Sequence, residues 1–374
     1  MFVTGVCCDR CPGATAGSAS RFARRRLLKT AVFQPLPDAA SLAGAAGQPY
    51  PGRTGLTKRP GSTAATRPGG AAATRSAGSG AAQLYRAVTG EVLDASPHLI
   101  TIGSAAGERR YNLTADATAW RGGTLEPAAV NPGDEAVIRL LPGKSNVADR
   151  VWASIGRVTG TIVESGPHHL IVDEGKTKGL KEVVIPPQAN GRIQVRFPNL
   201  RAGYLIDVIG LRRRGYLEGL IPATSQPPYR ADQVQRQSPA GGRPPDAIGG
   251  SAIWHDPGYE PYGVLGLFYP AVDSAARCAE DAAAGFPPGQ APAFRDLPYL
   301  AVGSMLSVRN ECTGDAMTMP VTGCAPIARL FNDHCVTCQT SPRGRVADLT
   351  LASFVALGGE LEAGCFNATL MVRR

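Results

Sequence analysis

Six cysteines in the last third of the chain are the residues with the clearest capacity for chemistry. An even set confined to one segment predicts disulfide bonds made in an oxidising compartment. Cys335 and Cys338 also have the spacing of half a zinc site, but no second close pair accompanies them, so disulfides are favoured over a metal. A thioredoxin-like redox pair is disfavoured because no βαβ pattern surrounds it. We therefore expect no metal and no cofactor, and the disulfide pairing stays open. The six are Cys278, Cys312, Cys324, Cys335, Cys338 and Cys365.

Four motifs in the same region carry a resemblance to a known family. They are the Gly-Ser-Ala-Ile-Trp-His-Asp run at 250–256, the Leu-Pro to Val-Arg-Asn run at 297–310, the Gly-Arg-x-x-Asp-Leu-Thr run at 344–350 and the last strand at 365–372. In this order they resemble the double-psi β-barrel of rare lipoprotein A and the expansins. The resemblance covers residues 249–374 and implies a disulfide-braced barrel that binds cell-wall polysaccharide.

The departures from the family pattern bear on catalysis. Lytic members carry an aspartate in Val-x-Asp-Arg-Gly-Pro and a histidine in Ala-His-Arg, and here Gly323 and Phe294 stand at those positions. Cleaving a glycosidic bond requires a positioned acid, usually one of a carboxylate pair. Only Asp348 matches a family carboxylate, so the resemblance favours binding over cleavage. Four other acidic residues lie nearby in sequence and could substitute: Glu280, Asp296, Asp315 and Asp333.

Five residues are candidates for polysaccharide binding on the strength of this resemblance: Trp254, His255, Asp256, Tyr299 and Asp348. Asp348 has two alternative structural roles, as an N-cap of the helix that follows it or as an acceptor of hydrogen bonds from the crossing loop of the barrel. Trp254 and Tyr299 either form a sugar-stacking surface or belong to the core, and the core is favoured. Asp348 is the single candidate for catalysis, should any cleavage remain.

An internal repeat precedes this region. The run that begins Val88-Thr89-Gly90 recurs at Val158-Thr159-Gly160, and each copy reads as a β-branched strand, a Pro-containing turn and a second strand. Further strands are expected at residues 136–141, 193–197 and 204–211. Modules of this size with about five short strands are typical of oligonucleotide/oligosaccharide-binding (OB) barrels. We therefore expect two OB-like barrels, at residues 84–155 and 156–224.

Other candidate ligands in the repeats have plainer explanations. The histidines His98, His168 and His169 occupy the turns without a nearby cysteine or acidic cluster, so polar turn residues are favoured over a metal site. Trp120 and Trp152 are expected to be core or rim anchors.

Charge is distributed unevenly along the chain. The formal net charge is +9, and residues 1–83 account for all of it because the remaining bases and acids balance. A folded nucleic-acid-binding protein carries its basic excess on the folded surface, so nucleic acid is disfavoured as a partner. The basic run at 212–214 is expected to be a solvated strand end. Residues 39–83 and 225–248 are rich in small residues and proline and predict a disordered tether and a linker.

The fold class expected is mainly β: a disordered tail at 1–83, two OB-like barrels, and a double-psi barrel. Arg24 and Arg25 begin a sequence similar to a twin-arginine export motif, although the apolar run behind it is short. Together with the cysteines it favours export to the cell surface. No apolar run is long enough for a membrane-spanning helix. The expected partner is peptidoglycan or another cell-wall polysaccharide. A divergent lytic enzyme and a surface protein that binds a protein partner through the small barrels are the alternatives.

Overall fold

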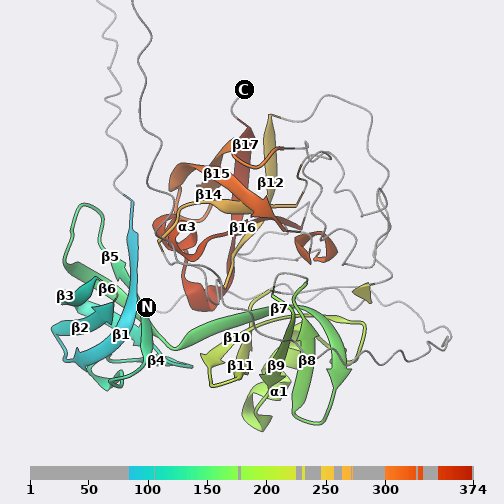
Figure 1. Cartoon of the computed structure of the whole chain (residues 1–374), viewed down its shortest axis with the longest axis horizontal. Helices are drawn as coiled ribbons and strands as arrows, with labels where there is room; N and C mark the ends of the chain where they lie inside the picture. The colour runs from blue at the N-terminus through green and yellow to red at the C-terminus, as the bar shows by residue number, and fades with distance from the viewer. Residues whose placement is uncertain are drawn as a thin grey trace, which may run out of the picture. The chain divides into compact units, whose positions relative to one another are not determined.

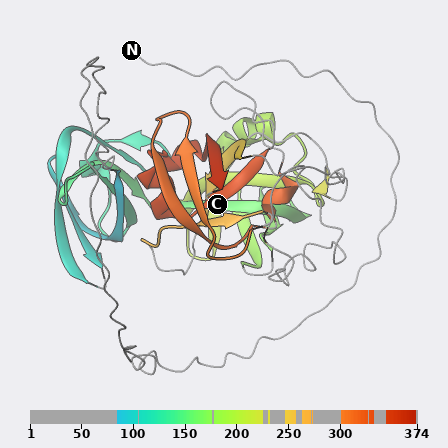
Figure 2. The ribbon, with the colours of Figure 1, turned by 90° about the horizontal axis from the view of Figure 1, so that it is seen from above.

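The computed structural model describes residues 84–104, 106–175, 178–224, 230–231, 246–256, 263–270, 272, 300–325, 327–331 and 344–372. These residues are mainly β and form three closed barrels, which follow one another along the chain as the colours of Figures 1 and 2 show. The predicted tether, the export motif at Arg24 and Arg25 and most of the predicted linker lie outside the described residues.

The first barrel has the OB strand order. Its five main strands pair in the order β1-β2-β3-β6-β5, and β5 returns to β1. All pairs are antiparallel except β3 with β6. The elements are β1 (Arg86–Ala95), β2 (Leu99–Ser104), β3 (Gly107–Trp120), β4 (Thr124–Leu125), the 3-10 turn η1 (Pro127–Ala129), β5 (Glu135–Leu140) and β6 (Val147–Ala153).

The second barrel repeats this arrangement. Its order is β7-β8-β9-β11-β10, with β10 returning to β7, and its one parallel pair, β9 with β11, occupies the place of β3 with β6. The prediction of two OB-like barrels is confirmed. The elements are β7 (Ile155–Ser165), β8 (His169–Asp173), β9 (Leu180–Val184), α1 (Pro187–Arg196), β10 (Leu205–Arg212) and β11 (Tyr216–Pro222).

The glycine of the Val-Thr-Gly repeat has the same role in both barrels. A Cβ on Gly90 would lie 2.5 Å from the carbonyl oxygen of Gly103, and one on Gly160 would lie 2.1 Å from that of Asp173. Both distances are below any real carbon–oxygen contact, so only glycine lets the two hairpin strands approach. The motif is therefore repeated because each barrel needs a glycine where its two hairpin strands pack closely.

One predicted strand is wrong. Residues 193–197 alternate apolar and polar, which predicts a strand, but they form the end of helix α1 and its C-cap. Ala189, Ile193 and Phe197 are buried at helical spacing, whereas Val195 is 78 % exposed. The alternation arose because Val195, an apolar residue, faces solvent. The two prolines at 186 and 187 start the helix, a position where proline is favourable.

The third barrel has six strands in the closed order β12-β16-β13-β15-β14-β17. Two of its pairs are parallel, β12 with β16 and β13 with β15. The elements are β12 (Ala247–Trp254), β13 (Leu267–Tyr269), β14 (Met305–Asn310), β15 (Ala316–Cys324), η4 (Ile327–Leu330), β16 (Arg345–Leu349), α3 (Leu351–Ala356), η5 (Leu361–Ala363) and β17 (Cys365–Val372).

The largest hydrophobic core is shared by all three barrels. It includes Trp152 from the first, Ile209 from the second and Trp254 from the third. Trp120 and Trp152 are 3 % and 0 % exposed, as expected of core anchors. No helix in the described part of the chain is long and apolar enough to cross a membrane.

Candidate functional site

Asp348 lies in the middle of the third barrel wall. Its strand, β16, is hydrogen-bonded between β12 and β13, and Asp348 is paired in register with Ile253 on one side and Phe268 on the other. The neighbouring residues of β16 are buried, and the Asp348 side chain is 13 % exposed. The strand order thus brings residues from three distant segments around one carboxylate.

His255 is the partner of this carboxylate. It follows the end of β12, and its Nδ1 lies 3.6 Å from Asp348 Oδ2, longer than a direct hydrogen bond. The imidazole stacks on the Phe268 ring with centroids 4.5 Å apart. The backbone N–H of His255 donates to the carbonyl of Leu349, which fixes the turn that presents the ring. Both sequence candidates therefore meet in one site.

The environment keeps Asp348 ionised. Burial alone would raise the pKa of its carboxyl, but the attraction of His255, helped by the charges of Lys178 and Arg345, holds the pKa below its usual range. Its Oδ1 is buried and accepts no hydrogen bond within the described structure. A charged oxygen without a donor is unfavourable in a fold, by about 1–3 kcal/mol or more. Among the described residues, no donor satisfies this buried oxygen.

Gly323 lies against the ring of Phe268. It is paired with Phe268 across β13 and β15, and a Cβ on Gly323 would lie 3.0 Å from the Phe268 ring. The same ring carries His255 as its stacking partner. Phe268 therefore fills the space next to residue 323, between the glycine and the imidazole.

The remaining candidates have structural contacts. Trp254 is fully buried and its Nε1 donates to the carbonyl of Leu361, so its ring belongs to the core. Asp256 accepts a hydrogen bond from the backbone N–H of Arg157 and another from the Arg212 guanidinium. These two contacts fasten the end of β12 to the second barrel.

Thr350, rather than Asp348, caps helix α3. Its side chain accepts a hydrogen bond from the backbone N–H of Ser353. The N-cap role considered for Asp348 is therefore wrong, because the helix begins two residues further on than that role requires. This removes the simplest structural reason for a carboxylate at position 348.

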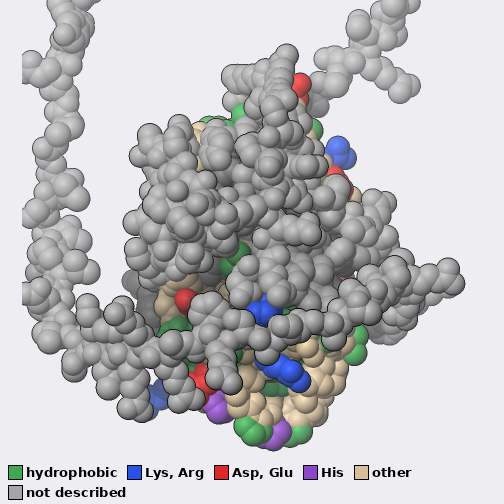
Figure 3. All heavy atoms as spheres, turned by 90° about the vertical axis from the view of Figure 1, so that its right-hand side faces the viewer, with side chains coloured by type: hydrophobic (Ala, Val, Ile, Leu, Met, Phe, Trp, Pro, Cys, Tyr) green, Lys and Arg blue, Asp and Glu red, His purple; other side chains and the backbone are tan. Residues whose placement is uncertain are grey.

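Arg212 is not the solvated residue that the basic run suggests. Its guanidinium contacts Glu135 of the first barrel and Asp256 of the third, while Arg213 pairs with Glu218. His168 lies in the β7–β8 turn and His169 is the first residue of β8; both are exposed, and histidine side chains reach the surface in Figure 3. His98 is exposed in the equivalent turn. Among the described residues no group of side chains is arranged to hold a metal ion.

Several candidates lie outside the described residues. They are Tyr299, Phe294, the acidic residues Glu280, Asp296 and Asp333, and the cysteines Cys278, Cys335 and Cys338. Cys312 is exposed and Cys365 is buried, and no disulfide joins two of the three described cysteines. The disulfide framework therefore stays a prediction.

Sequence reasoning missed a second buried carboxylate. Asp207 is 0 % exposed and accepts two hydrogen bonds from Arg157, one from Arg345 and one from Thr224. Burial opposes its charge, but the two arginines hold its pKa below the usual range. Arg345 stands in the Gly-Arg-x-x-Asp motif, so this arginine was visible in the sequence while its partner was not.

Lys178 and Glu174 of the second barrel are also neighbours that the sequence did not suggest. Their charged atoms are 4.0 Å apart, and Glu174 Oε1 accepts a hydrogen bond from the Thr159 N–H. Burial raises the pKa of Glu174. The Lys178 charge is felt by both Glu174 and Asp348, so the β8–β9 connection lies close to the Asp348 site.

Comparison with known proteins gives no relative. No protein-family model, no curated protein and no solved structure matches the chain.

Proposed function

We propose that this protein binds a cell-wall polysaccharide, peptidoglycan or another glycan, at His255 and Asp348 without cleaving it. The observation that carries the proposal is the Asp348 carboxylate, which is ionised and 13 % exposed as a side chain; its Oδ1 is buried, and its Oδ2 lies toward His255 at 3.6 Å. A sugar hydroxyl is a donor, and a carboxylate only accepts, so the two are complementary. The aromatic pair of His255 and Phe268 beside it is typical of sites that bind ligands with apolar faces.

Binding is favoured over cleavage by the state of the carboxylate. A general acid must carry a proton at the working pH, and a group whose pKa lies below its usual range does not. Position 323, where the lytic members have their aspartate, is a glycine here, and a larger side chain would crowd the Phe268 ring. Asp348 is thus suited to accept hydrogen bonds and unsuited to protonate a leaving group.

Export to the cell surface and a double-psi topology braced by disulfides are part of the same proposal. They are supported by the resemblance of the motifs at 250–256 and 344–350 and by the six clustered cysteines. Non-reducing peptide mapping of the purified protein tests the cysteines. Disulfide-linked peptides are expected, and six free thiols would contradict both the framework and the export.

Sedimentation of the full chain with purified peptidoglycan sacculi and with insoluble glucan tests the function. We expect the protein to sediment with at least one of these, and Asp348→Asn to lose most of this binding while staying folded. Asp315→Asn is the matched control, because Asp315 lies in the β14–β15 turn, and β14 is opposite β16 in the barrel order. It should bind like the wild type.

The soluble fraction of the same assay distinguishes the alternatives. Sugar fragments released by the wild type and absent with Asp348→Asn would replace binding with enzymatic cleavage. Failure to sediment with any glycan would overturn the proposal in favour of a surface protein that binds a protein partner.

A further inference from the structure

A cavity of about 240 Å³ lies against the first barrel. It is lined by residues of β1, β2 and β3 and by Gly263 and Leu351 of the third barrel, and it is partly open to solvent. Its apolar surface includes Val88, Ile102 and Leu351. The volume is suited to one sugar-sized molecule. Neither His255 nor Asp348 lines this cavity.

Tyr111 is a mostly buried residue of this cavity. The residue is 4 % exposed and lies in the core of the first barrel, but its hydroxyl is not one of the fully enclosed polar atoms of the described residues that lack a partner, and Tyr111 lines the cavity. A ligand there is therefore in position to bond this hydroxyl.

Arg109 contributes a positive charge to the same cavity. It is paired in register with Ile102, and Tyr111 is paired with Ile100, so both side chains share the face that carries the barrel core. Arg109 forms no ion pair within the described parts of the chain and is exposed. No aspartate or glutamate is among the described residues that line the cavity.

We infer that this cavity is a binding site for a pyranose that carries a carboxylate, such as the sugar acid of an acidic glycan. The planar guanidinium of Arg109 matches a carboxylate with two parallel hydrogen bonds. The hydroxyls of Tyr111 and Thr89 can bond the ring hydroxyls, and the apolar surface accommodates the carbon face of the ring. The site goes beyond the proposed function because it uses a different barrel and none of the residues around Asp348.

Isothermal titration of the full chain with D-glucuronate, N-acetylmuramate, D-glucose and inorganic phosphate tests the inference. We expect saturable binding of at least one of the two sugar acids, and at least tenfold weaker binding of glucose and of phosphate. The two acids differ in where the carboxylate is attached, so their ratio identifies the source of the ligand.

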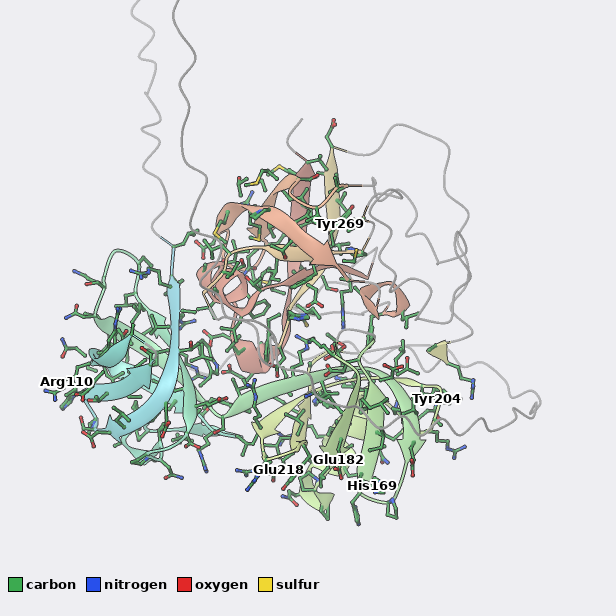
Figure 4. The ribbon with its side chains drawn as sticks, in the orientation of Figure 1. Arg110, His169, Glu182, Tyr204, Glu218 and Tyr269 are labelled. Atoms are coloured by element: carbon green, nitrogen blue, oxygen red, sulfur yellow. The ribbon has the colours of Figure 1, made fainter. Side chains whose placement is uncertain are left out.

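Variants then locate the site. Arg109→Gln should weaken sugar-acid binding by about tenfold or more, since it removes a charge-assisted pair. Tyr111→Phe, which removes one neutral hydrogen bond, should weaken it by roughly two- to tenfold. Arg110→Gln is the matched control, because Arg110 lies on the opposite strand face, is 69 % exposed and pairs with Glu108 (Figure 4). It should bind within twofold of the wild type.

Three results would overturn the inference: no saturable binding of either acid, phosphate binding as tightly as the acids, or equal losses in the Arg109 and Arg110 variants. Thermal unfolding of each variant shows that a lost affinity is not lost structure. Asp348→Asn should bind the sugar acids normally, so failure of the glycan assay and failure of this one are distinguishable.

Discussion

Asp207, which is fully buried, and Asp348, whose side chain is 13 % exposed, are carboxylates of neighbouring barrels that differ in how many donors the described residues give them. Asp207 has two arginines and a threonine around it, with donor distances from 2.6 to 3.1 Å. Asp348 has one imidazole at 3.6 Å and an oxygen without a donor in the described structure. A saturated carboxylate is part of the fold's own framework. An unsaturated one has capacity for a ligand.

The largest effect is expected from Asp207→Asn. It leaves Arg157 and Arg345 buried without a counter-charge, and breaking a buried ion pair this way costs about 3–5 kcal/mol. Urea unfolding followed by tryptophan fluorescence measures this loss. Asp149→Asn, at the partly exposed Arg139 pair, is the control and should cost less. A loss below about 1 kcal/mol for Asp207→Asn would erase the distinction between the two carboxylates.

The pH dependence of stability should follow from the same residue. The pKa of Asp207 is lowered in the folded state, so its ionisation stabilises the fold above the pKa of an unfolded aspartate, about 3.9. That contribution is lost as the pH falls through the lower folded value. The stability difference between wild type and Asp207→Asn should therefore be full at pH 6 and shrink in strong acid. A difference that stays constant down to about pH 2 would contradict this linkage.

Gly323→Ala should have an intermediate effect. The new methyl would lie 3.0 Å from the Phe268 ring, and that ring also stacks on the imidazole of His255. Overpacking of this kind costs about 1–3 kcal/mol. Urea unfolding gives the loss, and sedimentation with glycan should weaken as well because His255 is displaced. Gly249→Ala is the control, since no atom lies within 4 Å of its Cβ. Equal stability of both variants would show that Phe268 moves freely.

The smallest effect on stability is expected from Asp348→Asn. Among the described residues, its carboxylate has one charged partner, His255, at 3.6 Å. The loss of unfolding free energy should therefore stay under about 1 kcal/mol. Glycan binding should nevertheless be the property most reduced. A loss as large as that of Asp207→Asn would make Asp348 structural and would remove the basis of the proposed site.

The sequence predicted the local parts of this picture well. Gly90 and Gly160 recur because hairpin strands must approach closely, so the two small barrels were visible as a repeat. The motifs made Asp348 and His255 candidates, and the structure places their side chains next to each other. Helix α1 was missed because the exposed Val195 produced an alternation typical of strands.

The long-range contacts that distinguish the structural carboxylate Asp207 from the candidate site at Asp348 could not be predicted from the sequence. Arg157 and Arg345 are 50 and 138 residues from Asp207, and nothing local in the chain selects that partner. The same holds for Phe268, whose role follows from its pairing with Gly323 across the barrel. Such pairings depend on strand order, which a pattern of apolar residues does not fix.

The Arg157–Asp207–Arg345 cluster also bears on how such a protein can be inherited. Two of its residues belong to the second barrel and one to the third, and all are almost completely buried. A gene fragment encoding the third barrel alone would separate Arg345 from its only carboxylate in the cluster, and one encoding the second alone would lose an arginine. Any segment that recombination moves without breaking this cluster must therefore contain both of these barrels, although the sequence divides them at a proline-rich linker.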